Sequence, residues 1–173
     1  MGKIIRVLFK TIFLISLLPT VYFLATYRDL TGIFVDAEKY RSETKLIAVH
    51  HDGIERKVSI KEIQDYHKDS CGWESGFGYN FYLKNGKIYQ VHELNACTAH
   101  AIGFNCNAVS ICLHTSDKHD FRTQLNLILL INFLKLKFDI EKQNIVGHRD
   151  LPGNDTKCPD LDMNKVRTWI IGK

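Results

Sequence analysis

The sequence has little excess charge of either sign. Lysine and arginine outnumber aspartate and glutamate by 23 to 19 over the 173 residues, and by 17 to 15 from Lys45 onward. This balance, and the absence of a basic stripe with interleaved aromatic residues, excludes nucleic acid as an expected partner. The sequence also has no internal repeat and no low-complexity tract. Its 45% hydrophobic and 24% charged content is that of one globular domain.

The N-terminal part of the chain differs in composition from the rest. Three basic residues precede an uncharged apolar run over residues 11–27, and its 17 residues are at the lower limit for a spanning helix. Basic residues before an apolar run are also typical of a signal peptide, but no small-x-small cleavage site follows, because bulky Phe23 stands two positions before Ala25. We therefore expect a signal-anchor over residues 1–28, with a cleaved signal peptide as the alternative.

Both interpretations of this segment send the rest of the chain out of the cytoplasm, because the basic residues stay inside. We expect the segment to hold the protein in the inner membrane, with the folded domain in the periplasm or at the cell exterior. Cleavage would instead release a secreted protein. The polar residues 29–44 are expected to form a linker, and residues 45–173 the folded domain.

Apolar patterns from residue 45 onward alternate between the period of strands and the period of helices. Ser59 with Glu62 three residues later is a capping box, which marks a helix start, and Asn85-Gly86 predicts a tight hairpin. Together these patterns predict an α/β or α+β domain with a hairpin inside it. The expected strands are residues 45–51, 76–83, 87–93, 108–113 and 144–148, and the expected helices follow Ser59, span residues 124–138 and follow Asp162.

The expected helix over residues 124–138 is apolar on nearly all sides, which indicates burial against a sheet. A second membrane span is the rival interpretation. Asn132, Lys135 and Lys137 interrupt the apolar run, and the segment is too short to cross a bilayer. We therefore expect a buried helix.

A loop from Gly147 to Pro159 places His148 and Cys158 ten residues apart. Its glycines and prolines are incompatible with a helix, but they allow the chain to fold back and bring the two side chains together. Imidazole and thiolate are the protein ligands that zinc prefers. Two ligands do not make a metal site, so a third must come from elsewhere in the chain.

The candidates for the third ligand are His50 and His51, at the end of the expected strand 45–51. Functional residues of sheet proteins gather where core strands end. Successive strand residues point to opposite faces, so only one of the two histidines can face a given site.

Four ordered groups of residues occur between Lys45 and Trp169. They are Val49-His50-His51, then Gly78-Tyr79-Asn80-Phe81, then Ala99-His100-Ala101 with Gly103 and Asn105, and last Gly147-His148-Arg149-Asp150 with Thr156, Cys158 and Pro159. In order and approximate spacing, these groups resemble the zinc-dependent type-2 N-acetylmuramoyl-L-alanine amidases. That family includes phage lysis amidases and the animal peptidoglycan recognition proteins.

The resemblance implies an α/β fold in which a single mixed central β-sheet is flanked by helices. It also implies that His50, His148 and Cys158 bind one zinc ion and leave its fourth position open, as catalysis requires. The resemblance thus decides between the two candidate histidines in favour of His50. His51 would point away from the metal and have a structural or supporting role.

The resemblance further implies catalytic roles for Tyr79 and Thr156. The Tyr79 hydroxyl would orient the attacking water or donate to the oxyanion, and Thr156 would contact the reacting group. His100 and Asn105 match a loop that borders the substrate cleft, so we expect both to bind substrate. Cys112 stands where certain family members carry a glutamate proposed as general base, which leaves the general base of this chain open.

We therefore expect an endolysin-like peptidoglycan hydrolase, acting as a monomer. It would use zinc-activated water to cleave the amide bond between N-acetylmuramic acid and the L-alanine of the stem peptide. One alternative is a non-catalytic module of the same fold that binds peptidoglycan. Another is a zinc hydrolase that cuts a different amide bond. The complete ligand set together with Tyr79 favours the amidase.

The five cysteines are an odd number. One that binds a metal leaves four, either free or paired, and the sequence does not choose between these states: Cys71, Cys97, Cys106 and Cys112. Outside the cytoplasm some of them could form disulfides. Cys97 and Cys106 are close enough in sequence to close a small loop.

Overall fold

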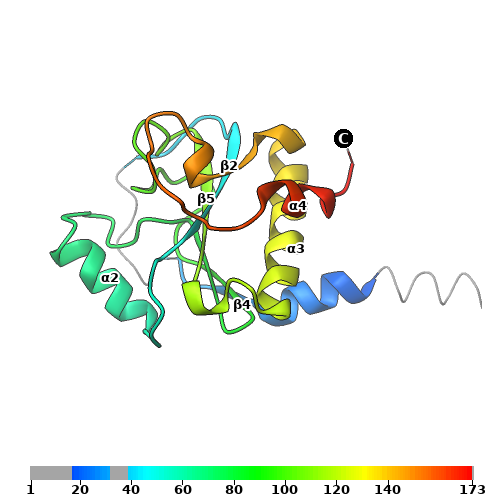
Figure 1. Ribbon diagram of the computed structural model, residues 1–173, viewed down its shortest axis with the longest axis horizontal. Coiled ribbons are helices and arrows are strands. Elements are labelled where there is room, and N and C mark those ends of the chain that lie inside the picture. Colours follow the sequence, from blue (N-terminus) through cyan, green and yellow to red (C-terminus); the bar gives the residue numbers. More distant parts are fainter. Residues whose placement is uncertain (1–16, 32–38, 173) are drawn as a thin grey trace, which may run out of the picture.

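A six-stranded mixed β-sheet forms the centre of the molecule (Figure 1). The computed structural model describes residues 17–31 and 39–172. The strand order is β1-β4-β3-β5-β2-β6; β3, β5, β2 and β6 are mutually parallel, whereas β4 is antiparallel to β3 and parallel to β1. The strands are β1 (Tyr27–Asp29), β2 (Leu46–His51), β3 (Phe81–Lys84), β4 (Lys87–Gln90), β5 (Ala108–Leu113) and β6 (Ile145–Gly147). The expectation of a single mixed central sheet is confirmed.

Helices cover both faces of this sheet (Figure 1). The α-helices are α2 (Ile60–Asp69), α3 (Phe121–Phe138) and α4 (Met163–Thr168), and the short 3-10 helices are η1 (Thr115–Asp117), η2 (Lys142–Asn144) and η3 (His148–Asp150). The capping box of Ser59 and Glu62 begins α2 as predicted. Helix α3 begins three residues earlier than expected because the Asp120 side chain accepts a hydrogen bond from the Thr123 N–H and caps it.

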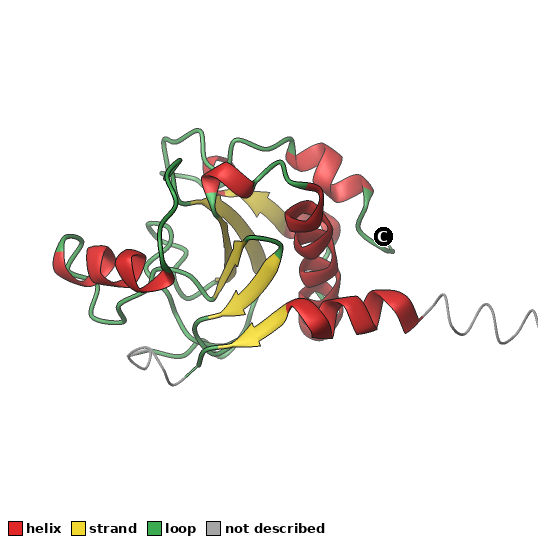
Figure 2. Ribbon diagram, turned by 90° about the horizontal axis from the view of Figure 1, so that it is seen from below, coloured by secondary structure: helices red, strands yellow, loops and turns green. Residues whose placement is uncertain are grey.

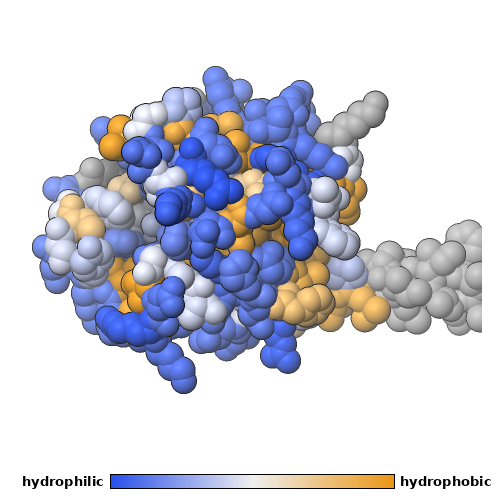
Figure 3. Space-filling model, viewed as in Figure 1, coloured by the Kyte–Doolittle hydropathy of each residue, from blue (hydrophilic) through white to orange (hydrophobic). Residues whose placement is uncertain are grey.

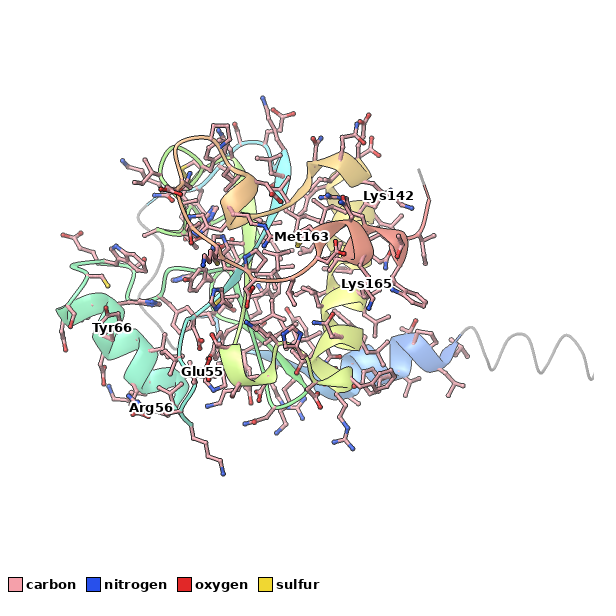
Figure 4. All side chains as sticks on the ribbon, in the orientation of Figure 1. Glu55, Arg56, Tyr66, Lys142, Met163 and Lys165 are labelled. Atoms are coloured by element: carbon pink, nitrogen blue, oxygen red, sulfur yellow. A yellow bond between two sulfur atoms is a disulfide. The ribbon has the colours of Figure 1, made fainter. Side chains whose placement is uncertain are left out.

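Side chains of the central strands alternate between two cores. Ile47 and Val49 of β2 face α3 and α4 in the larger core, where four aliphatic side chains of α3 are fully buried. Each such side chain stabilises the fold by about 1.5–3 kcal/mol. On the other face, Ala48 and His50 lie on the side of α2. Figure 4 shows Met163 between α4 and the sheet, and Tyr66 at the outer rim of the molecule on α2.

The predicted hairpin joins β3 to β4. Asn85 and Gly86 form its two-residue turn, with φ angles of 51° and 62°. Both values lie in the left-handed region that a type I′ turn requires, which is why Asn-Gly is favoured there. Strand β3 begins at Phe81 rather than at residue 76, because residues 76–80 form an irregular, bent segment that leads into the sheet.

The apolar N-terminal segment packs against the domain. Residues 17–26 are helical and lead directly into β1 (Figure 2). The Phe23 ring lies 5.8 Å from that of Phe133 on α3, and the Thr26 hydroxyl donates to the Asn126 side chain over 3.2 Å. The helical segment 17–26 also exposes large apolar side chains to solvent (Figure 3), namely Leu17, Leu18, Val21 and Leu24.

The end of the apolar run thus contacts α3 and continues into a strand of the sheet, and the expected segment boundary at residue 28 stays a prediction. The first part of the expected signal-anchor, residues 1–16, lies outside the described residues. Among residues 17–31 and 39–172, no helix combines the length and the hydropathy needed to cross a membrane.

Part of the expected linker is also built into the domain. Arg41 is only 7% exposed, and its guanidinium donates to the carbonyls of Leu94 and Ala96 and to the Thr44 hydroxyl. Burial lowers the pKa of Arg41 to about 10, so the group stays charged at neutral pH. Residues 39–44 are therefore a fixed strap over the turn that follows β4, which the sequence pattern did not reveal.

Replacing Arg41 by methionine tests the importance of this strap. Arg41→Met leaves two buried carbonyls without charged donors, so we expect the free energy of unfolding to fall by about 2–4 kcal/mol. Urea denaturation measures the change. Arg56→Met is the matched control, because the Arg56 side chain is 68% exposed and its loss is expected to change stability by less than about 0.5 kcal/mol. Equal denaturation midpoints for the two variants would contradict the assignment.

Candidate metal centre

The central strands bring two histidines to one edge of the sheet. Strands β2 and β6 are neighbours and parallel, with Val49 opposite Gly147. A histidine follows each of these two residues: His50 is the last but one residue of β2, and His148 is the first residue of η3. Because parallel strands end at the same edge, the two imidazoles lie close together, with ring centroids 4.6 Å apart.

The loop after β6 folds back to add a cysteine. The Arg149 N–H donates to the Cys158 carbonyl over 2.8 Å, and the Cys158 N–H donates to the Thr156 hydroxyl over 3.1 Å. Gly147 permits this return, because a Cβ atom there would lie 2.6 Å from the Cδ atom of Pro159. The loop predicted from its glycines and prolines therefore does bring His148 and Cys158 together.

His50, His148 and Cys158 fit a tetrahedral metal ion. Their ligating atoms all lie within 4.8 Å of one another, and Cys158 Sγ is 3.9 Å from His50 Nδ1. Zinc–ligand bonds of ordinary length separate neighbouring ligand atoms by roughly 3.3–3.7 Å, so small movements would close the cluster on an ion. Two imidazoles and one thiol are also the donor types that zinc takes.

Burial keeps two donor groups of the cluster, His50 and Cys158, uncharged in the absence of a cation. Burial is the main cause that lowers the pKa of His50 well below 6.5, so its imidazole is neutral and able to ligate. Burial also raises the pKa of Cys158 to about 11, although the His51 N–H, 3.2 Å from its sulfur, lowers it. A thiol in such surroundings ionises readily only when a cation compensates its charge.

Both histidines place Nε2 beside a polar partner. His50 Nε2 lies 3.1 Å from His100 Nδ1, and His148 Nε2 lies 3.0 Å from the Asn154 side-chain oxygen. In each ring this contact leaves Nδ1 as the nitrogen available to a metal ion, and His50 Nδ1 lies 3.9 Å from Cys158 Sγ. Burial lowers the pKa of His100 to about 3, so this neutral ring can accept a hydrogen bond from His50.

Tyr79 lies beside the cluster and keeps its proton. Its ring centroid is 5.2 Å from that of His50. Burial raises the pKa of Tyr79 well above 10, and the neighbouring Cys112 and Cys158 raise it further. Burial likewise raises the pKa of the Cys112 thiol well above 9. At neutral pH Tyr79 is therefore a hydrogen-bond donor, and neither group is a base.

The other predicted site residues lie around the cluster in different ways. His51 turns away, as expected, and its Nδ1 lies 3.0 Å from the Thr115 hydroxyl. His100 is only 5% exposed and stands behind His50. Asn105 is exposed, and its side-chain oxygen accepts from the Ala101 N–H. It lines a cavity of about 440 Å³ with Trp73 and Glu74. Substrate contact by His100 and Asn105 stays a prediction.

Sequence reasoning missed two polar residues of this region: Asn154, which contacts His148, and Asp52, which follows the histidine pair. Asp52 follows His51 directly and accepts hydrogen bonds from Tyr82 and His114, both over 2.7 Å. Burial raises its pKa, but these bonds outweigh burial and hold the pKa below its usual value. A polar residue next to the histidine pair was the one signal available for Asp52. Asn154 stood in the loop among other turn residues, with no signal of its own.

Comparison with known proteins agrees with this geometry. Residues 40–160 match the family described as N-acetylmuramoyl-L-alanine amidase. The chain belongs to this family. The resemblance inferred from the sequence is thereby confirmed, and the match begins at residue 40, within the strap that carries Arg41.

Relatives of this amidase-family chain include viral and animal proteins. An endolysin of Enterobacteria phage T3 is 33% identical over 138 residues, which are 73% of this chain and 87% of the endolysin. Peptidoglycan-recognition protein SC2 of Drosophila simulans is 29% identical over 118 residues, which are 65% of this chain but only 62% of that protein's length.

A solved structure of similar fold comes from a bacterium. It is the N-acetylmuramoyl-L-alanine amidase LysC from Clostridium intestinale, which is 26% identical. The TM-score is 0.70, and the match covers 82% of this chain and 95% of LysC. The structure of bumblebee PGRP-SA, at 21% identity and a TM-score of 0.65, shares the fold.

Metal analysis tests the cluster directly. Protein reconstituted with zinc and then desalted is expected to retain about one zinc ion per chain, and Cys158→Ala to retain almost none, because a structural or catalytic site loses its ion with a primary ligand. Cys71→Ala is the control, since Cys71 is a free cysteine outside the cluster. Equal zinc content in the two variants would show that Cys158 is not a ligand.

Proposed function

We propose that this chain is a zinc-dependent N-acetylmuramoyl-L-alanine amidase. It hydrolyses the amide bond between N-acetylmuramic acid and the L-alanine of the stem peptide in peptidoglycan. The observation that carries the proposal is the cluster of buried His50, half-buried His148 and buried Cys158 beside the protonated hydroxyl of Tyr79, in a chain of this family. Three protein donors leave the fourth position of a tetrahedral ion open to water or substrate.

The chain's own residues supply most of the reaction geometry. A zinc ion held by His50, His148 and Cys158 would supply a water of lowered pKa and would polarise the scissile carbonyl. Tyr79 keeps its proton and donates to the carbonyl oxygen, where negative charge develops in the transition state. The Thr156 oxygen accepts from the Cys158 N–H, which leaves its own O–H free to donate to the substrate.

The rival proposal is a module that binds peptidoglycan without cutting it. Peptidoglycan-recognition proteins among the relatives support this alternative. The amidase is favoured because the complete donor set is present, Cys158 included, and because its atoms converge. A site that only binds the glycan and peptide has no need of a buried thiol beside two imidazoles.

We also propose that the protein acts outside the cytoplasm as a monomer, anchored in the inner membrane by its N-terminal segment or secreted after cleavage. The basic residues and apolar run at the N-terminus support export. A disulfide between Cys97 and Cys106 supports an oxidising compartment. Peptidoglycan is the partner that such a location offers.

Digestion of purified sacculi by the full chain tests the amidase. We expect free stem peptides that begin with L-alanine, identified by mass spectrometry, and no new reducing sugar ends. A chelator should abolish release and added zinc should restore it. Cys158→Ala is the control for contaminating hydrolases. Sacculi that bind the protein but stay intact would establish the binding module instead, and peptides cut within the stem would establish a different hydrolase.

Tyr79→Phe tests the role of the phenol. Removing one donor to an oxyanion costs about 100-fold or more in kcat, so turnover should fall by that factor while bound zinc is unchanged. Tyr66→Phe is the matched control, because Tyr66 is 59% exposed on α2. Unchanged kcat in Tyr79→Phe would remove Tyr79 from the mechanism.

A further inference from the structure

A disulfide closes a loop beside the metal centre. Cys97 and Cys106 are bonded to each other. Residues 97–106 lie between β4 and β5, and we call them the disulfide loop. Its first residue is fixed to the strap, because the Cys97 N–H donates to the Lys39 carbonyl over 2.9 Å. The loop is therefore held both by a covalent bond across its base and by the N-terminal strap.

The disulfide loop contacts the first histidine directly. His100, in the middle of the loop, places Nδ1 3.1 Å from His50 Nε2. His100 is buried, and its backbone N–H donates to the Thr98 carbonyl over 2.8 Å within the same loop. The backbone at His100 is thus fixed within the loop, and burial confines the ring that faces His50.

The same loop reaches the second histidine through Asn154. The Asn154 oxygen lies 3.0 Å from His148 Nε2 and accepts from the Ile102 N–H over 3.1 Å. The Asn154 amide nitrogen donates to the carbonyls of Ile102, over 3.3 Å, and Pro152, over 3.1 Å. The Asn154 side-chain oxygen can accept from both His148 Nε2 and the Ile102 N–H because it has two lone pairs.

We propose that the disulfide loop is the positioning element of the metal centre: through His100 and Asn154 it fixes the outer nitrogen of both histidine ligands. With each Nε2 hydrogen-bonded, each ring presents Nδ1 to the ion in a set orientation. This proposal rests on the metal site of the proposed function, and not on which bond is cut. His100 and Asn154 are positioning residues here, since they act through His50 and His148.

The disulfide that closes the loop helps to hold these contacts in place. An open chain of this length samples many conformations, and the disulfide removes most of them. Without it, the segment carrying His100 and Ile102 is held by hydrogen bonds and by the packing of Ala101 and Phe104, with no covalent closure. The metal centre therefore depends on the oxidised state of Cys97 and Cys106, although neither is a ligand.

The test measures metal binding on the full chain, without any substrate. Asn154→Ala and His100→Ala should each weaken zinc binding by about 10–100-fold in competition with a chromogenic chelator, the usual effect of losing a hydrogen-bond partner of a ligand. Asn107→Ala is the matched control, because Asn107 is exposed at the end of the same segment. The double variant Cys97→Ala/Cys106→Ala should lose affinity similarly, and Cys71→Ala should not.

A spectroscopic readout separates positioning from general loss of stability. With cobalt at saturation, the visible absorption bands of Asn154→Ala should shift, whereas Asn107→Ala should match the native spectrum. Asn154→Asp retains an acceptor for His148 and should therefore recover part of the zinc affinity. This variant also keeps the proposal testable if Asn154→Ala does not fold. Native affinity and native cobalt bands in Asn154→Ala and the double cysteine variant would overturn the proposal. The two proposals fail separately. Loss of zinc affinity in Asn154→Ala would support the positioning role even if the native chain left sacculi undigested, whereas digestion of sacculi by the native chain would support the amidase even if Asn154→Ala kept native zinc affinity.

Discussion

The parallel pairing of β2 with β6 is the constraint on which the metal centre depends. It sets Val49 opposite Gly147, and so places the histidine that follows each of them at the same edge. Side chains alternate between faces along a strand, so a slip of one residue would move His50 to the α3 side of the sheet. The register is secured by burial, since Ile47 and Val49 fill the core under α3.

Burial then gives the centre its chemical character. Low polarity around His50 and Cys158 keeps the imidazole neutral and makes a bare thiolate unfavourable. A cation is what lets the thiol ionise there, because a buried charge is tolerated only when it is paired. The same surroundings keep the proton on Tyr79. Burial by the surrounding protein thus sets the protonation states of the side chains at this edge of the sheet.

Local signals predicted much of this arrangement, and long-range contacts account for what was missed. The capping box at Ser59 and the hairpin at Asn85-Gly86 need only neighbouring residues, so the sequence was sufficient. The donor set was predictable because the loop carrying Cys158 has a distinctive composition, and the family resemblance chose the third ligand. Arg41 and Asn154 were not predictable, because their partners lie on segments distant in sequence and no local pattern marks them.

Strand β1 has a consequence for how the chain can be handled in solution. It pairs with β4 along Tyr27–Asp29 and so occupies what would otherwise be an open edge of the sheet. Open edges present unpaired N–H and C=O groups that recruit strands from other molecules. A chain shortened past residue 30 therefore bares the β4 edge and invites strand exchange between copies. The segment that begins as an apolar helix thus ends as a short strand that covers the edge of β4.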